Sequence, residues 1–202
     1  VLDITIAHDF TSESGYQRVA NILRSTCNVA VLVSFPCTGG CLLNAGINAK
    51  NPKCGPKLEA HFKLFKLLWR QYQRLNSEFE GINTVFEWPR FCTYWMKAMV
   101  KKLSWRLNIF YADFDGCQYG LSVDENVYLK KPWRFATNIP DILPVFNLLC
   151  PGSSESHVNQ MTRGKWALSS QYYTPFMTLL IHVALFRFFQ GCLLYTSDAA
   201  DE

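Results

Sequence analysis

The sequence predicts an α/β fold with a three-layer, Rossmann-like sheet, and three observations support this prediction. Short apolar runs rich in β-branched residues, such as Val29–Ser34, are typical of buried parallel strands. These runs alternate with segments of helical periodicity, as in proteins whose helices cover both faces of a sheet. The last two strand-like segments are joined without a long helix, which predicts an antiparallel strand pair at the end of the sheet.

Composition indicates one globular domain. The chain has 202 residues, of which 49% are apolar and 18% charged. The ending Cys192-Leu-Leu-Tyr-Thr-Ser-Asp-Ala-Ala-Asp-Glu202 resembles a translated sequencing adapter, so we expect a single domain over residues 1–190 and a non-native tail over 191–202. Three of the 16 acidic residues lie in this tail, so the rest carries 13 acids against 20 bases. The resulting charge of +7 is compatible with a nucleic-acid partner.

The first residues of the chain and its cysteines indicate whether the sequence is a fragment and in which cellular compartment it is expected. Val1 opens directly into a strand-like run, so we expect an internal fragment that is truncated at its N-terminus. The seven cysteines outside the tail are odd in number and scattered, which argues against a disulfide scaffold. A reducing, intracellular compartment is therefore expected, in the nucleus or cytoplasm.

Each expected strand is a short apolar run bounded by turn-forming residues. The expected strands are Leu2–Ala7, Val29–Ser34, Ile82–Phe86, Leu107–Tyr111 and Lys131–Thr137, with Gln118–Val123 as an extension or a hairpin arm before a turn at Asp124-Glu125-Asn126.

Helices are expected where apolar residues recur every three or four positions. The first follows a cap at Thr11 or Ser12 and runs to Ser25, and the others are Lys57–Phe79, Met96–Leu103 and a last helix that opens at Thr174-Pro175. The apolar run of this last helix, Phe176–Phe189, is shorter than the roughly 20 residues that a membrane span needs. The segments Cys41–Pro56 and Cys150–Lys165 lack periodicity and are expected to be loops.

Two residues at strand ends are candidates for chemistry. Cys37 follows a strand and precedes two glycines, and ligands of α/β proteins bind at this edge of the sheet. It is a nucleophile, a metal ligand or a small core residue. Glu87 follows an apolar strand, where an unpaired buried carboxylate is costly. An ion pair with Arg90 or Arg134 is the structural alternative.

The sequence resembles the cytosine-5 DNA methyltransferases in two short motifs. A strand followed by Pro36-Cys37 comes first, and one helix later a strand leads to Glu87-Trp88-Pro89. The resemblance implies a class I methyltransferase-like sheet that acts on DNA with S-adenosylmethionine as cofactor. Thr38 and Trp88 depart from the residues usual in the family, and the glycine-rich cofactor loop is absent from this sequence.

The same resemblance implies roles for individual residues. Cys37 would attack carbon 6 of a flipped cytosine, and Glu87 would hold the edge of the base. Arg134 would assist near the cytosine. Asp9 and Pro36 would contact the cofactor, although Asp9 also suits a loop cap.

A longer string extends over most of the chain and resembles an uncharacterised domain of retroelement polyproteins from dinoflagellates and related protists. It reads PCTGG, EWP, DFDGC, KPWR and YTP in order. This resemblance implies that the chain belongs to a larger polyprotein, and it implies no established activity.

Two alternatives to an enzyme remain open. The first is a non-catalytic module of such a polyprotein that binds nucleic acid or protein. The second is a structural domain in which zinc is held by three or four of Cys37, Cys41, Cys92 and Cys117, although no paired Cys-x-x-Cys motif is present.

Overall fold

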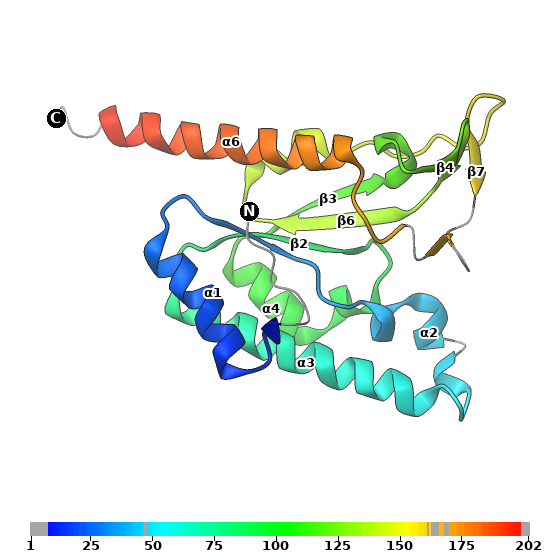
Figure 1. Ribbon diagram of the computed structural model, residues 1–202, viewed down its shortest axis with the longest axis horizontal. Helices are drawn as coiled ribbons and strands as arrows, with labels where there is room; N and C mark the ends of the chain where they lie inside the picture. Colours follow the sequence, from blue (N-terminus) through cyan, green and yellow to red (C-terminus); the bar gives the residue numbers. More distant parts are fainter. Residues whose placement is uncertain (1–7, 47, 161, 163–165, 168–169, 199–202) are drawn as a thin grey trace. The chain divides into compact units, whose positions relative to one another are not determined.

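The computed structural model describes residues 8–46, 48–160, 162, 166–167 and 170–198 and shows the expected α/β class (Figure 1). The strand expected at Leu2–Ala7 lies outside the described residues. The helices are α1 Glu13–Ser25, α2 Leu42–Gly46, α3 Gly55–Glu78, α4 Ala98–Arg106 and α6 Pro175–Asp198. The strands are β1 Ala30–Val33, β2 Asn83–Pro89, β3 Phe110–Asp115, β4 Ser122–Asp124, β5 Val127–Leu129, β6 Pro132–Thr137 and β7 Val158–Gln160.

The chain divides into two compact units. The first contains the chain up to Thr84 together with Phe91–Asn108, and the second contains Val85–Arg90 together with Ile109–Glu202. Strand β2 begins in the first unit and continues in the second. It neighbours β1 on one side and β6 on the other, in a sheet of order β1-β2-β6-β3.

Helix α1 of the first unit begins where its cap residue predicts. The Ser12 hydroxyl accepts a hydrogen bond from the Gly15 backbone N–H at 3.1 Å, which satisfies one of the free donors of the first turn. Two carboxylates link α1 to α3: Glu13 pairs with Arg74 at 2.5 Å, and Glu78 accepts a hydrogen bond from the Tyr16 hydroxyl at 2.5 Å. The predicted boundary and cap of this helix are confirmed.

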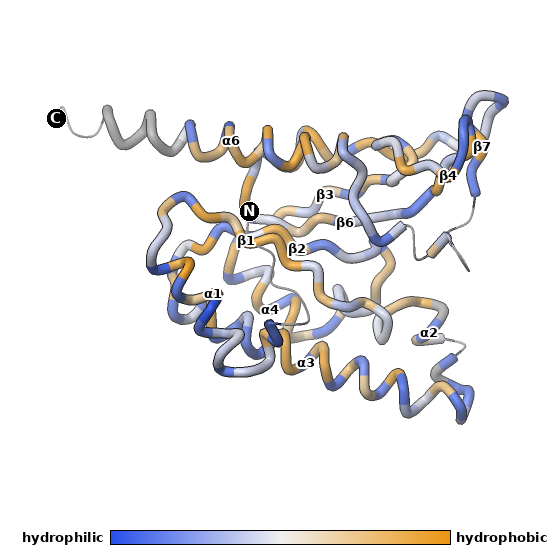
Figure 2. The backbone as a smooth tube through the Cα atoms, viewed as in Figure 1, coloured by the Kyte–Doolittle hydropathy of each residue, from blue (hydrophilic) through white to orange (hydrophobic). Residues whose placement is uncertain are grey.

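Helix α3 is amphipathic, with apolar and polar residues alternating along its length (Figure 2). Pro56 occupies its first turn, which suits proline because it lacks the N–H that a first turn leaves without a partner. Its buried face carries aromatic and leucine side chains at helical spacing, namely Phe65, Trp69, Tyr72 and Leu75. The Tyr72 hydroxyl donates to Thr84 Oγ1 at 2.7 Å, and this oxygen donates to the Val31 carbonyl of β1 at 3.3 Å. The start of β2 is thereby joined to β1.

The second unit is organised around β6. This strand runs antiparallel to both of its neighbours, β2 and β3, so the expected antiparallel pair is present. One face of the strands carries Phe114, Trp133 and Phe135, all fully buried. The Phe114 ring lies 4.8 Å from that of Phe135 and 5.0 Å from that of Phe146. Each such ring contributes about 1.5–3 kcal/mol when it leaves water, so this cluster forms the core of the unit.

Strand β3 lies further along the chain than the sequence predicts. The expected segment was Leu107–Tyr111, but α4 extends to Arg106, and Asn108 then adopts a positive φ of 51° that ends the turn. Asp113, which follows the expected segment, is therefore a strand residue. Its charge is tolerated there because Arg134 lies directly opposite on β6.

Two expected loops contain regular structure. Cys41–Pro56 includes the short helix α2, and Cys150–Lys165 includes β7, which pairs in parallel with β5. The hairpin of β4 and β5 turns at Asp124-Glu125-Asn126, as predicted, with Asn126 at a φ of 57°. None of the helices in the described part of the chain combines the length and the apolar character that crossing a bilayer requires.

Candidate functional site

Cys37 lies in the first unit, on the loop that follows β1. Its carbonyl accepts a hydrogen bond from the Gly40 N–H at 2.8 Å and so starts a short 3₁₀ helix, Thr38–Gly40. The side chain is half-buried. The structure therefore delivers this cysteine to a tight turn and leaves part of its surface accessible, which suits a nucleophile better than a core residue.

The two glycines after Cys37 are required by close packing. A Cβ atom on Gly40 would lie 2.6 Å from Cys92 Sγ and 2.8 Å from the Tyr94 ring, and one on Gly39 would lie 2.5 Å from the Tyr94 hydroxyl. Tyr94 is fully buried, and burial raises the pKa of its hydroxyl above the ordinary value, with further contributions from Cys92 and Cys37. The Pro-Cys-Thr-Gly-Gly turn therefore packs directly against the buried side chain of Tyr94.

The residues expected to contact the cofactor lie on either side of β1 in sequence. Asp9 is exposed and has a φ of 37°. Its Oδ1 accepts hydrogen bonds from the Thr11 backbone N–H at 3.1 Å and from the Thr11 hydroxyl at 2.5 Å. The carboxylate closes its own turn, which is the loop-cap alternative. Pro36 is exposed next to Cys37.

Glu87 belongs to the second unit and lies within β2, two residues before its end, rather than after the strand. It is directly opposite Phe135 and is only 8% exposed. Because opposite residues share a face of a sheet, Glu87 lies on the aromatic face of β6. The Tyr173 ring packs edge-on against Phe135 at 6.1 Å, and the pKa of its hydroxyl is raised by burial and then by the charge of Glu87.

Arg134 lies on the other face of the same strands, because it is opposite Trp88 and adjacent to Phe135. Its guanidinium holds Asp113 through two hydrogen bonds, from Nε at 2.6 Å and from a terminal nitrogen at 2.8 Å. These bonds raise the pKa of Arg134. The register therefore separates Arg134 from Glu87 and brings it together with Asp113.

Arg90, which directly follows β2, pairs with two aspartates of β3. Its guanidinium donates to Asp115 Oδ1 at 2.8 Å, and its Nε lies 3.9 Å from Asp113 Oδ2. Asp115 is 3% exposed, so Arg90 supplies the opposite charge that a buried carboxylate needs. The two arginines and two aspartates form a charged network across β2, β3 and β6.

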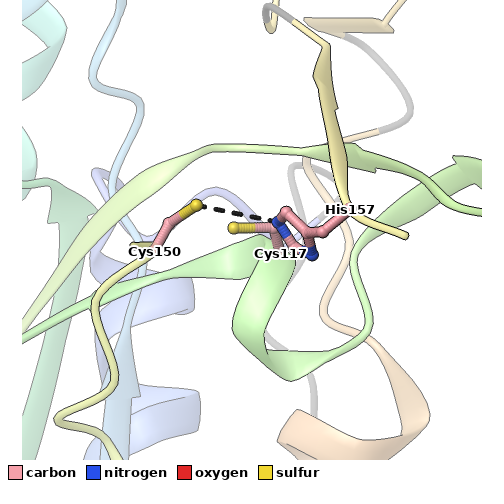
Figure 3. Close-up of side chains that lie close together, drawn as sticks. All are labelled: Cys117, Cys150 and His157. Carbon is pink, nitrogen blue, oxygen red and sulfur yellow. Dashed lines mark hydrogen bonds between the residues drawn. The ribbon is translucent and has the colours of Figure 1, made fainter. Parts of the chain in front are cut away.

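A cluster of Cys117, Cys150 and His157 in the second unit was not expected from the sequence (Figure 3). Their ligand atoms all lie within 4.8 Å of one another, and Cys150 Sγ is 3.6 Å from His157 Nε2. Among the described residues, the cysteine and histidine side chains that meet in this way are these three, rather than Cys37, Cys41 and Cys92. Cys117 was among the cysteines expected to hold zinc, whereas Cys150 and His157 were not, and the signal that could have found them is their separation by only seven positions.

Burial and then the neighbouring Cys150 together raise the pKa of Cys117 to about 12. For Cys150, burial also acts to raise the pKa, but the hydrogen bond from Asn159 Nδ2 at 3.2 Å and other contacts outweigh it and lower the value. Cys150 is therefore the thiol of the pair that ionises first.

Comparison of the chain with protein families, with curated proteins and with solved structures finds no match. The function is therefore inferred from the residues and their geometry.

Proposed function

We propose that the chain is a methyltransferase-like domain directed at nucleic acid, of the cytosine-5 type, within a retroelement polyprotein. In this proposal Cys37 supplies the nucleophilic thiolate and Glu87 the carboxyl group that recognises the base. The observation that carries it is the burial of Glu87 on β2, in a sheet where the antiparallel strand β6 lies between β2 and β3. A carboxyl group at this position supports recognition of a base edge, because a carboxylate accepts hydrogen bonds from the amino group and ring N–H of a base.

The position of Cys37 supports the nucleophilic role. Its half-buried thiol lies on a turn held by the Gly40 N–H and by close packing on Tyr94. A rigid turn fixes the direction of approach, which contributes to rate when a thiolate must meet one ring carbon. In the proposed step the Cys37 thiolate forms a bond to carbon 6 of the base, and the π bond between carbons 5 and 6 breaks, so that its electron pair passes to carbon 5.

S-adenosylmethionine is the proposed methyl donor, but the described residues do not fit its site. Asp9 was expected to contact it, yet Oδ1 of this carboxylate already binds Thr11. A carboxylate committed to its own turn is a poor ligand for a cofactor. The proposal therefore concerns what this chain does to the base and gives Asp9 a structural role.

The base-directed step can be tested without methyl transfer. A DNA duplex with pyrimidin-2-one in place of one cytosine accepts a thiolate at carbon 6, and carbon 5 then takes a proton from water. We expect the full chain to form a covalent adduct that survives denaturing electrophoresis. Cys37→Ala should abolish it, and Cys27→Ala, which changes an exposed cysteine, should not. Equal trapping by the chain and by Cys37→Ala would refute the nucleophile.

Glu87 is tested in the same assay with Glu87→Gln. The amide keeps the size of the side chain and removes its charge, so trapping should slow by about 10²–10³, the cost of removing one charge-stabilising group at a reacting centre. An unchanged trapping rate would remove Glu87 from the proposal and leave Cys37 in place.

A non-catalytic nucleic-acid-binding module is the second candidate, and one surface feature of the first unit favours it. A shallow hollow between α3 and α4 is lined by Arg74, Lys102 and Arg106 together with Gln73, Ser77 and Leu103. Arg74 pairs with Glu13, and the cations Lys102 and Arg106 of α4 suit the phosphates of a nucleic-acid backbone. This candidate predicts binding that depends strongly on salt and does not depend on Cys37.

A further inference from the structure

The Cys117, Cys150 and His157 side chains converge from three separate places in the second unit. Cys117 is in the 3₁₀ helix Gly116–Tyr119, directly after β3. Cys150 is in the segment between the 3₁₀ helix Pro140–Val145 and β7, and His157 directly precedes β7. In Figure 3 the two sulfur atoms and the imidazole point toward a common centre. Residues separated by 33 and 7 positions have thus been brought to one point by the fold.

The spacing of the three ligand atoms fits a tetrahedral zinc ion. With Zn–S near about 2.3 Å and Zn–N near about 2.05 Å, a tetrahedral site separates sulfur from nitrogen by about 3.6 Å and sulfur from sulfur by about 3.8 Å. The distance from Cys150 Sγ to His157 Nε2 is 3.6 Å. Since no pair of ligand atoms exceeds 4.8 Å, a contraction of at most about 1 Å would complete the geometry.

Neighbouring groups hold two of the ligands in place. The Tyr128 ring stacks on the His157 imidazole at 4.3 Å with an angle of 8°, which fixes the ring plane. Asn159 Nδ2 donates to Cys150 Sγ at 3.2 Å, and Asp115 Oδ2 accepts from the Cys150 backbone N–H at 2.9 Å. Hydrogen bonds that orient ligands in this way are typical of metal sites.

We propose that Cys117, Cys150 and His157 bind one Zn²⁺ ion through two thiolates and one imidazole. Thiolate and imidazole ligands favour zinc over the hard cations Mg²⁺ and Ca²⁺. Binding displaces one proton from each of the two thiols, so one Zn²⁺ enters and two protons leave. The three described side chains supply three of the four ligands of a tetrahedral site. This inference is independent of the proposed reaction at Cys37, which lies in the other unit.

The ion would act on the fold by joining the end of β3 to the segment before β7. Strand β7 has three residues and pairs only with β5 in the described part of the chain. So short a strand contributes little stability of its own. Zinc would therefore fix Cys150–Val158 against the core of the unit, and its removal should loosen this segment first.

The alternative for two nearby cysteines is a disulfide between Cys117 and Cys150, and the test separates the two states. The full chain, purified under reducing conditions without chelator, should contain one zinc per chain by elemental analysis. Its Co²⁺ form should show the absorption of a tetrahedral cobalt–thiolate site. Cys150→Ser should lose both properties, whereas Cys54→Ser, which changes a half-buried cysteine of the first unit, should keep both.

A rescue variant at position 157 distinguishes the loss of a metal ligand from unfolding of the chain. His157→Ala should bind Co²⁺ weakly, and His157→Cys should restore a tetrahedral site with stronger thiolate absorption. Asn159→Ala should weaken zinc binding by about 10–100-fold, as loss of an orienting hydrogen bond does. The proposal would be overturned if the unsubstituted chain contained no more zinc than Cys150→Ser. It would also be overturned if Cys117 and Cys150 were joined by a disulfide under the same reducing conditions.

Discussion

The close packing of the loop that carries Cys37 predicts that a side chain at position 40 destabilises the protein. In Gly40→Ala the new Cβ would lie 2.6 Å from Cys92 Sγ and 2.8 Å from two atoms of the Tyr94 ring. Both neighbours are buried, at 3% and 0% exposure, so neither side chain has free space into which it can turn. Ordinary contacts begin near 3.4 Å, so the backbone or the tyrosine must move by almost 1 Å. Overpacking of this kind costs about 1–3 kcal/mol.

Gly46→Ala is the matched control, because a Cβ at this position meets nothing within 4 Å and the residue lies in helix α2. This substitution should leave stability unchanged or raise it by about 0.4–1 kcal/mol, since alanine restricts the unfolded chain. Urea denaturation at equal protein concentration measures both variants. For a chain of this size each kcal/mol corresponds to about 2–4 °C in melting temperature.

Equal stability of Gly40→Ala and Gly46→Ala would contradict this packing. That result would mean that the Pro-Cys-Thr-Gly-Gly turn does not pack on Tyr94 as described. A loss of stability confined to Gly40→Ala would confirm the packing that holds Cys37 in position.

Two further predictions concern the first unit. The pKa of Glu13 is lowered to about 2 by its hydrogen bonds with Arg74 and Gln17, so the stability it contributes is complete above about pH 4.5 and is lost as the pH falls toward 2. Glu13→Gln should remove this part of the acid sensitivity in pH-dependent denaturation, and an unchanged acid profile would contradict the pairing. Replacing both Lys102 and Arg106 by glutamine should reduce the slope of log affinity for duplex DNA against log salt by about 1.8, which is about 0.9 for each phosphate that the variant no longer neutralises. An unchanged slope in a binding titration would exclude the hollow as the DNA-binding surface.

Neighbouring residues in the sequence predicted the long helices α1 and α3 of the first unit well, whereas the short helix α2 was missed. The Ser12 cap and Pro56 each act within one turn of their own helix, and the buried stripe of α3 follows from its spacing alone. Helix caps, first-turn prolines and apolar spacing are set by residues close together in the sequence, so they can be recognised without knowing the fold.

The sheet was harder to predict because its charges are balanced across strands. Asp113 is a charged residue within a strand, and its partner Arg134 lies directly opposite on β6. This pairing depends on strand register rather than on neighbouring sequence. The same register places Glu87 and Arg134 on opposite faces, which the sequence alone did not reveal. The Cys117, Cys150 and His157 cluster likewise depends on the packing of segments that are distant in the sequence.

Identification of the residue that carries the adduct shows whether Cys37 is the nucleophile of a base-directed site. The full chain would be reacted with pyrimidin-2-one duplex, digested, and mapped by mass spectrometry over its eight cysteines. We expect one thioether per chain, on the peptide that contains Pro36-Cys37-Thr38. An adduct on any other cysteine, or an unmodified Cys37 in the presence of excess duplex, would contradict it.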